Sequence, residues 1–279
     1  MHVKPHRMIG LSGKLLLSTF VFTFGFSTLG AQAQNQSDLD RWRAASHRTP
    51  RNVARDAFRH PTEVLRFFGV KDDSTVVEIL PGSRGYYLEI LAPYLKEKGL
   101  YIAANRDQMA RPKYLADHRK LLARLEAEPA LYSKVLVTKY NADRHEIAPP
   151  GSADFVLTFR NLHNWVKRDQ IEGALRAIHK ALKPGGVLGV VDHRGRTDLP
   201  QEAQNKTGYL RQDLAIELIE KGGFKLVASS EINANPKDTK DHPEGVWTLP
   251  PSFRLKDKDR AKYQAIGESD RFTLKFVKK

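Results

Sequence analysis

The chain has 279 residues, no cysteine and a formal net charge of +14 at pH 7. Its length suits one large α/β domain or two small ones, and the lack of cysteine excludes disulfide bonds. Lysines and arginines alternate with acidic residues, without a basic helix or an aromatic ladder, so we expect no nucleic-acid partner. The excess charge could produce a weak attraction to an anionic membrane surface.

The first residues have the pattern of a secretory signal peptide. Lys4, Arg7 and Lys14 precede the apolar run Leu15–Leu29, and the small-residue site Ala31-Gln32-Ala33 follows. This pattern predicts a signal peptide over residues 1–33 with cleavage after Ala33, which would leave a net charge of +11. An uncleaved anchor is the alternative, but the run is short for a membrane span. We therefore expect a periplasmic or secreted protein without a transmembrane domain after cleavage.

Helical and strand patterns alternate along the rest of the chain. Apolar residues at helical spacing predict helices at Ser37–Ala45, Arg51–Phe68 (interrupted at His60-Pro61), 87–95, Leu115–Glu128, 171–182 and Leu214–Lys221. Short β-branched or apolar runs predict strands at Thr75–Leu80, Leu100–Ala104, Val135–Thr138, Asp154–Phe159, Val187–Val191, Lys225–Ser229 and 272–276.

This alternation indicates an α/β fold with a doubly wound parallel sheet. The last two strands are joined by the long insertion Ser230–Glu268, so we expect them to form an antiparallel hairpin at one sheet edge. The alternation at 272–276 also suggests that the last strand has one wetter face. We divide the chain into the signal peptide, an N-terminal helical annex at 34–74 and an α/β domain at 75–279.

The segment VVEILPGSRG at residues 76–85 is the strongest local signal. A strand that breaks at Pro81-Gly82 and leads into a helix presents backbone N–H groups at the carboxyl edge of the sheet, a site for a polar or anionic ligand. Glu78 suits donors such as an amino group or a ribose hydroxyl. Arg84 interrupts the glycine loop, and either pairs with a ligand carboxylate or points to solvent.

The order of elements resembles class I S-adenosylmethionine-dependent methyltransferases. Four stretches are similar to that family: VVEILPGSRG at 76–85, DFVLTFRNLHNW at 154–165, LKPGGVLGVV at 182–191 and GFKL at 223–226. Three longer ones, GVVDHR at 189–194, SEINANPKDTKDHPEGVWTLPP at 230–251 and IGESDRFTLKF at 266–276, resemble a narrower family of exported bacterial methyltransferases. The resemblance implies a Rossmann-like, seven-stranded sheet with an antiparallel last strand.

The same resemblance implies that S-adenosylmethionine is the cofactor and a small molecule the methyl acceptor. The implied cofactor-binding residues are Glu78, Pro81, Gly82, Ser83, Gly85, Asn105, Asp143 and Asn161. Asn105 stands where the family usually has an acid for the ribose hydroxyls. For Asp143, a cap or surface-turn role is an equally good interpretation.

Three residues are catalytic candidates because they follow neighbouring strands at the same sheet edge. His163 comes after the fourth strand, and Asp192 and His193 end the fifth. A histidine there could serve as a base oriented by the carboxylate. Alternatively, Asp192 and His193 cap the loop, or the three bind a metal; no HxH or HExxH spacing supports a metal, and we expect none. No GxSxG elbow indicates a serine hydrolase.

Two classes of function remain open. The first is an exported methyltransferase; the second is a ligand-binding protein, or an enzyme of another kind, that retains the methyltransferase fold. The insertion is expected to pack over the site, with Gly267–Arg271 either crossing its mouth or forming an ion-paired turn. Trp165 and Trp247 either hold a planar acceptor or serve as packing residues.

Overall fold

The computed structural model describes residues 1–2, 38–106, 111–140 and 146–279. Most of the predicted signal peptide and the predicted cofactor residue Asp143 lie outside these ranges. Among the described residues, no helix has the length and apolar character needed to cross a membrane.

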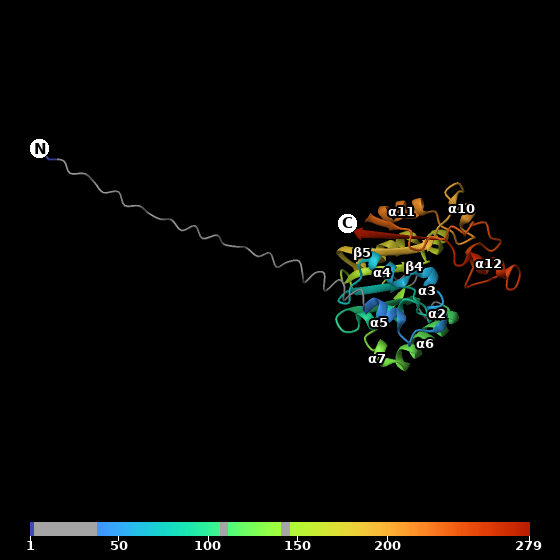
Figure 1. Ribbon diagram of the computed structural model, residues 1–279, viewed down its shortest axis with the longest axis horizontal. Coiled ribbons are helices and arrows are strands. Elements are labelled where there is room, and N and C mark those ends of the chain that lie inside the picture. The colour runs from blue at the N-terminus through green and yellow to red at the C-terminus, as the bar shows by residue number, and fades with distance from the viewer. Residues whose placement is uncertain (3–37, 107–110, 141–145) are drawn as a thin grey trace.

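A seven-stranded sheet with the order β3-β2-β1-β4-β5-β7-β6 forms the centre of the molecule (Figure 1). Its strands are β1 (Thr75–Ile79), β2 (Leu100–Arg106), β3 (Leu136–Tyr140), β4 (Ala153–Phe159), β5 (Leu182–His193), β6 (Phe224–Ser230) and β7 (Arg271–Lys278). The pairs from β3 to β5 are parallel, whereas β7 runs antiparallel to both β5 and β6. The predicted Rossmann-like sheet with an antiparallel last strand is confirmed.

The position of β7 differs from the prediction in one respect. The antiparallel pair lies at one end of the sheet, but β7 is inserted between β5 and β6, and β6 is the edge strand. Thr273 is fully buried, whereas Lys275 and Val277 are half-buried, so the wetter face expected from the alternation is present only in the second half of β7. Alternation in a sequence does not show whether a neighbouring strand and helix layer cover the second face.

Helices cover both faces of the sheet. On one face, α4 (Pro61–Phe68), α5 (Leu88–Leu95), α6 (Pro112–Ala127) and α7 (Pro129–Tyr132) share a buried cluster with Val76, Tyr101 and Leu157. On the other, α8 (Leu162–Lys167), α9 (Ile171–Ala181) and α11 (Gln212–Lys221) pack on Val77, Ile102 and Val190. The short helices α7, α8, α10 (Gln201–Gln204) and α12 (Arg260–Ile266) were not expected from the sequence.

The N-terminal helices belong to the same core as the sheet. Residues 38–44 are helical, and the predicted helix Arg51–Phe68 is divided into α2 (Pro50–Val53), α3 (Asp56–Arg59) and α4. The break falls at His60, whose φ of 43° is left-handed, and α4 ends at Gly69 with φ 93°. Leu65 and Phe68 are buried against α5. Side chains from these helices can therefore reach the edge of the sheet.

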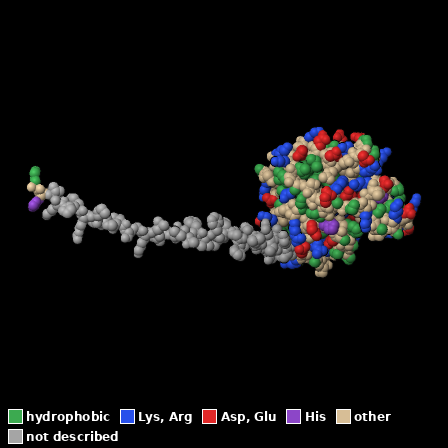
Figure 2. All heavy atoms as spheres, turned by 45° about the horizontal axis from the view of Figure 1, so that its top comes forward, with side chains coloured by type: hydrophobic (Ala, Val, Ile, Leu, Met, Phe, Trp, Pro, Cys, Tyr) green, Lys and Arg blue, Asp and Glu red, His purple; other side chains and the backbone are tan. Residues whose placement is uncertain are grey.

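The long insertion is folded onto the end of the molecule where α10 and α12 (Arg260–Ile266) lie in Figure 1. It contains one 3-10 turn, Gly245–Thr248. Buried Asp238 anchors it, because its carboxylate accepts hydrogen bonds from the Tyr209 hydroxyl at 2.8 Å and the Asp270 backbone N–H at 2.8 Å. On the face in Figure 2, basic and acidic side chains are interspersed, as the sequence predicts.

Candidate functional site

The loop after β1 has three residues in left-handed backbone conformations. Leu80, Gly82 and Gly85 have φ of 57°, 64° and 48°. A glycine accepts this region freely, whereas a leucine is strained by about 1–2 kcal/mol, which is typical of a loop held for a function. The Ser83 hydroxyl donates to Asp117 Oδ1 at 2.6 Å and thereby fastens the loop to α6.

Glu78, the last acidic residue before this loop, is 4% exposed and accepts a hydrogen bond from the Tyr101 hydroxyl at 2.6 Å. Burial raises the pKa of its carboxyl to about 7, against the opposing effects of the Tyr101 hydrogen bond and of Arg59 and Arg160. Glu78 therefore changes its charge near neutral pH. A cationic ligand group placed beside it would favour the carboxylate.

The other predicted cofactor residues have different surroundings. Asn105, near the end of β2, is 2% exposed, and its buried Oδ1 has no hydrogen-bond donor among the described residues. Asn161 Nδ2 donates to the Ile79 carbonyl and to Thr158 Oγ1, both at 3.1 Å, and so ties the loop after β4 to the end of β1. Arg84 is exposed. Glu78 and Asn105 thus lie in the last residues of two adjacent parallel strands, and the loop follows the first of them at the carboxyl edge of the sheet.

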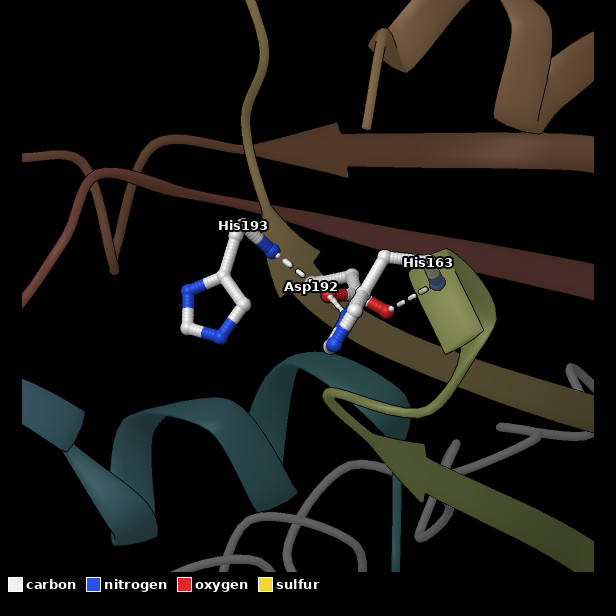
Figure 3. A group of neighbouring side chains, drawn as sticks. All are labelled: His163, Asp192 and His193. Carbon is white, nitrogen blue, oxygen red and sulfur yellow. Dashed lines mark hydrogen bonds and ion pairs between the residues drawn. The ribbon is translucent and has the colours of Figure 1, made fainter. Parts of the chain in front are cut away.

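His163 and Asp192 form a buried hydrogen-bonded pair (Figure 3). His163 Nδ1 lies 2.7 Å from Asp192 Oδ1, and the His163 backbone N–H donates to Asp192 Oδ2 at 3.2 Å. Because a carboxylate only accepts, Nδ1 carries the proton and Nε2 keeps a lone pair, which faces Asn164 Nδ2 at 2.8 Å. The pair brings α8 and β5 together and leaves one imidazole nitrogen with acceptor capacity.

His193 occupies the same edge, and its ring extends away from Asp192 in Figure 3. Its ring centroid lies 5.3 Å from that of His163, and its Nδ1 lies 2.5 Å from Ser269 Oγ. Burial is the main cause that holds its pKa well below the usual value, and the charges of Arg160, Arg271 and Arg59 act in the same direction. The ring is therefore neutral at physiological pH.

The three residues have the composition of a metal site, since one ligand atom from each lies within 4.8 Å of the others. Existing hydrogen bonds already engage the Asp192 carboxylate, which also accepts from the His193 backbone N–H at 2.7 Å. A metal ion would have to replace these bonds. The arrangement is better suited to an oriented acid–base pair.

The sequence did not predict that a group of arginines lies beside the histidines. Arg55 Nε donates to Glu268 Oε1 at 2.6 Å, Arg59 Nε to Oε2 at 3.3 Å, and Arg271 Nη1 lies 3.2 Å from Oε2. Burial opposes ionisation of Glu268, but these arginines hold its pKa below the usual range. The segment Gly267–Arg271 thus forms a buried ion-paired turn, and the density of charge in its sequence was the available signal.

The two tryptophans have different positions. Trp165 is 3% exposed and belongs to the core beneath α9, which fits its expected packing role. Trp247 is half-buried, and its ring lies 6.5 Å from that of His163. The insertion therefore reaches the candidate site, as the sequence predicts.

No protein-family model matches this chain, and no curated protein matches it in sequence. Solved structures do resemble it. A SAM-dependent methyltransferase from Aquifex aeolicus has a TM-score of 0.54 at 16% identity, covering 88% of this chain and 98% of its own. The [4+2]-cyclase SpnF has a TM-score of 0.53 at 16% identity, covering 90% and 96% respectively. A SAM-dependent methyltransferase from Methanosarcina mazei has a TM-score of 0.50 at 14% identity, covering 77% and 96%. The fold is that of the class I methyltransferases.

Proposed function

We propose that this protein is an exported S-adenosylmethionine-dependent methyltransferase that acts on a small-molecule acceptor. The observation that carries the proposal is the buried Glu78 carboxyl at the end of β1, followed by a strained glycine-bearing loop, in a methyltransferase fold. Parallel α/β sheets bind ligands at this edge.

The residues at this edge fit the cofactor. The Glu78 carboxylate suits the ammonium group of the methionine part. Within the described ranges the buried Asn105 Oδ1 has no hydrogen-bond donor, and a ribose hydroxyl would supply one. Gly82 and Gly85 allow the backbone to approach the ligand closely, and Pro81 and Ser83 shape the turn between them. When bound, S-adenosylmethionine supplies an electrophilic methyl group on its sulfonium.

The His163–Asp192 pair would act on the acceptor. A neutral imidazole whose Nδ1–H is held by a carboxylate can accept a proton at Nε2, and the carboxylate then stabilises the imidazolium. This function requires Asn164 Nδ2 to move away from Nε2, or the acceptor to displace it. His193, kept neutral by burial, lines the same space without adding charge. The pair would prepare a hydroxyl or amine for attack on the methyl group.

A second candidate is an enzyme or ligand-binding protein that keeps this fold without transferring methyl groups. The similarity to SpnF supports it, because that structure is named as a cyclase. Export also favours it, since the cofactor is made in the cytoplasm, whereas the pattern at residues 1–33 predicts secretion.

Turnover separates the two candidates. The purified protein is incubated with S-adenosylmethionine and a small-molecule extract, and S-adenosylhomocysteine is measured. We expect product from the wild type and from His179→Ala, a control on α9, and a loss of about 10²–10⁴-fold in His163→Ala. Cofactor binding without product from any extract would favour the second candidate.

A further inference from the structure

Four arginines from separate parts of the chain converge beside the histidines. Arg55 and Arg59 come from the N-terminal helices, Arg160 follows β4 and Arg271 begins β7. Arg59 and Arg271 are each 3% exposed. Within the described ranges, Glu268 is the carboxylate that pairs with Arg55, Arg59 and Arg271. The group therefore carries a buried excess of positive charge.

Arg160 has no counter-charge of its own. Its side chain makes no hydrogen bond or ion pair with the described part of the chain, although it is half-buried. Burial, and then the like charges of Arg59 and Arg55, lower its pKa well below the usual value. In addition, Arg55 Nη2 and Arg59 Nη2 are buried without a hydrogen-bond acceptor among those residues. Buried nitrogens without an acceptor and a half-buried charge without a paired carboxylate both cost stability in the free protein.

Arg59, Arg160 and Arg271 line a narrow cavity with room for about one oxygen-sized group. Its lining comprises Arg59, Tyr87, Phe159, Arg160, Val191, Asn233 and Arg271. The rings of Tyr87 and Phe159 stack at 3.8 Å and form an apolar wall. Arg59 and Arg160 both influence the pKa of Glu78 and the pKa of His193 through their charges. The cavity is thus within electrostatic reach of the predicted cofactor residue and the predicted catalytic residues.

We infer that Arg59, Arg160 and Arg271 bind an anionic oxygen group, a carboxylate or a phosphate, of the methyl acceptor. Guanidinium groups present paired N–H donors that match such oxygens, and an anion would give Arg160 a counter-charge and Arg59 Nη2 an acceptor. Assignment of the anion to the acceptor rests on the proposed function. The existence of the anion site does not.

Melting of the full-length protein, without cofactor, tests the anion site. Sodium acetate and sodium phosphate are compared with sodium chloride at equal ionic strength. At an anion concentration about 20 times the dissociation constant, we expect a rise in Tm of about 4–7 °C for acetate, phosphate or both. The salt that raises Tm, acetate or phosphate, shows whether the site binds a carboxylate or a phosphate.

Arg160→Gln should raise the dissociation constant of that anion roughly tenfold or more, because a charged hydrogen-bond donor is lost. Arg176→Gln, at an exposed position on α9, is the matched control and should leave the shift unchanged. In chloride, Arg160→Gln should melt no lower than the wild type, since it removes an unpaired charge. Equal shifts in chloride and in both test salts, or an undiminished shift in Arg160→Gln, would overturn the anion site.

A third arm identifies the source of the anion. If the acceptor supplies it, the effective salt should still raise Tm in saturating S-adenosylmethionine. Loss of the salt effect in the presence of the cofactor would assign the cavity to the cofactor's own carboxylate and overturn the acceptor assignment. If the cofactor does not bind, the proposed function fails, whereas the first two arms still decide whether the anion site exists.

Discussion

Replacement of Glu78 by glutamine should change how the stability of the protein depends on pH. The Glu78 carboxyl is buried, and its pKa is raised from 4.5 to about 7. Between these values, the folded protein holds a proton that the unfolded chain has released. The free energy of unfolding therefore falls as pH rises through this window. Glutamine has nearly the same shape and does not titrate, so Glu78→Gln should lack this contribution.

The size of the effect follows from the two pKa values. Each unit of difference is worth about 1.4 kcal/mol, so the full window corresponds to about 3 kcal/mol. Between pH 5 and pH 8, the part expected from Glu78 is about 2.5 kcal/mol, because the window is not completely spanned. From pH 5 to pH 8, the free energy of unfolding of the wild type should therefore fall by about 2.5 kcal/mol more than that of Glu78→Gln.

Urea denaturation at pH 5 and pH 8 measures this difference directly. Glu217→Gln is the matched control, because Glu217 is 56% exposed on α11 and should show the pH dependence of the wild type. If Glu78→Gln and the wild type lose the same stability between the two pH values, Glu78 is not a buried titrating carboxyl, and its assignment to the ligand site loses its basis.

Three further predictions follow from the same geometry. Glu268→Gln removes the carboxylate shared by three arginines and should lower the free energy of unfolding, measured in urea, by about 3–5 kcal/mol. A loss as small as that caused by Glu217→Gln would contradict the ion-paired turn. Asn105→Ala should weaken S-adenosylmethionine binding by roughly tenfold, because its Oδ1 has no hydrogen-bond donor in the described part of the free protein; calorimetry showing unchanged affinity would exclude the ribose contact. Residues 1–33 fused to alkaline phosphatase, which needs the disulfides of an oxidising compartment, should give an active enzyme, and an inactive fusion retained in the cytoplasm would overturn export.

The part of the site that could be predicted is the part encoded locally. Glu78 stands directly before a strand-ending turn, and its place at the sheet edge follows from that pattern. His163 and Asp192 follow or end strands that pair in parallel, with Phe159 beside Val191, so their proximity also follows from the strand order.

The arginine group depends on contacts that no local pattern contains. Arg59 and Glu268 are 209 residues apart in sequence and meet only because α3 packs near the start of β7. The insertion of β7 between β5 and β6 is likewise decided by tertiary pairing. The left-handed φ of Leu80 could not be predicted for a different reason, because a leucine rarely adopts this conformation and its presence in a sequence does not indicate it.

Titration of the purified protein with S-adenosylmethionine in a calorimeter tests the central claim most directly. The account predicts saturable binding with a dissociation constant between about 1 μM and 1 mM, the range usual for enzyme substrates, and much weaker binding to Glu78→Gln. Absence of both heat and a thermal shift at millimolar cofactor would contradict it.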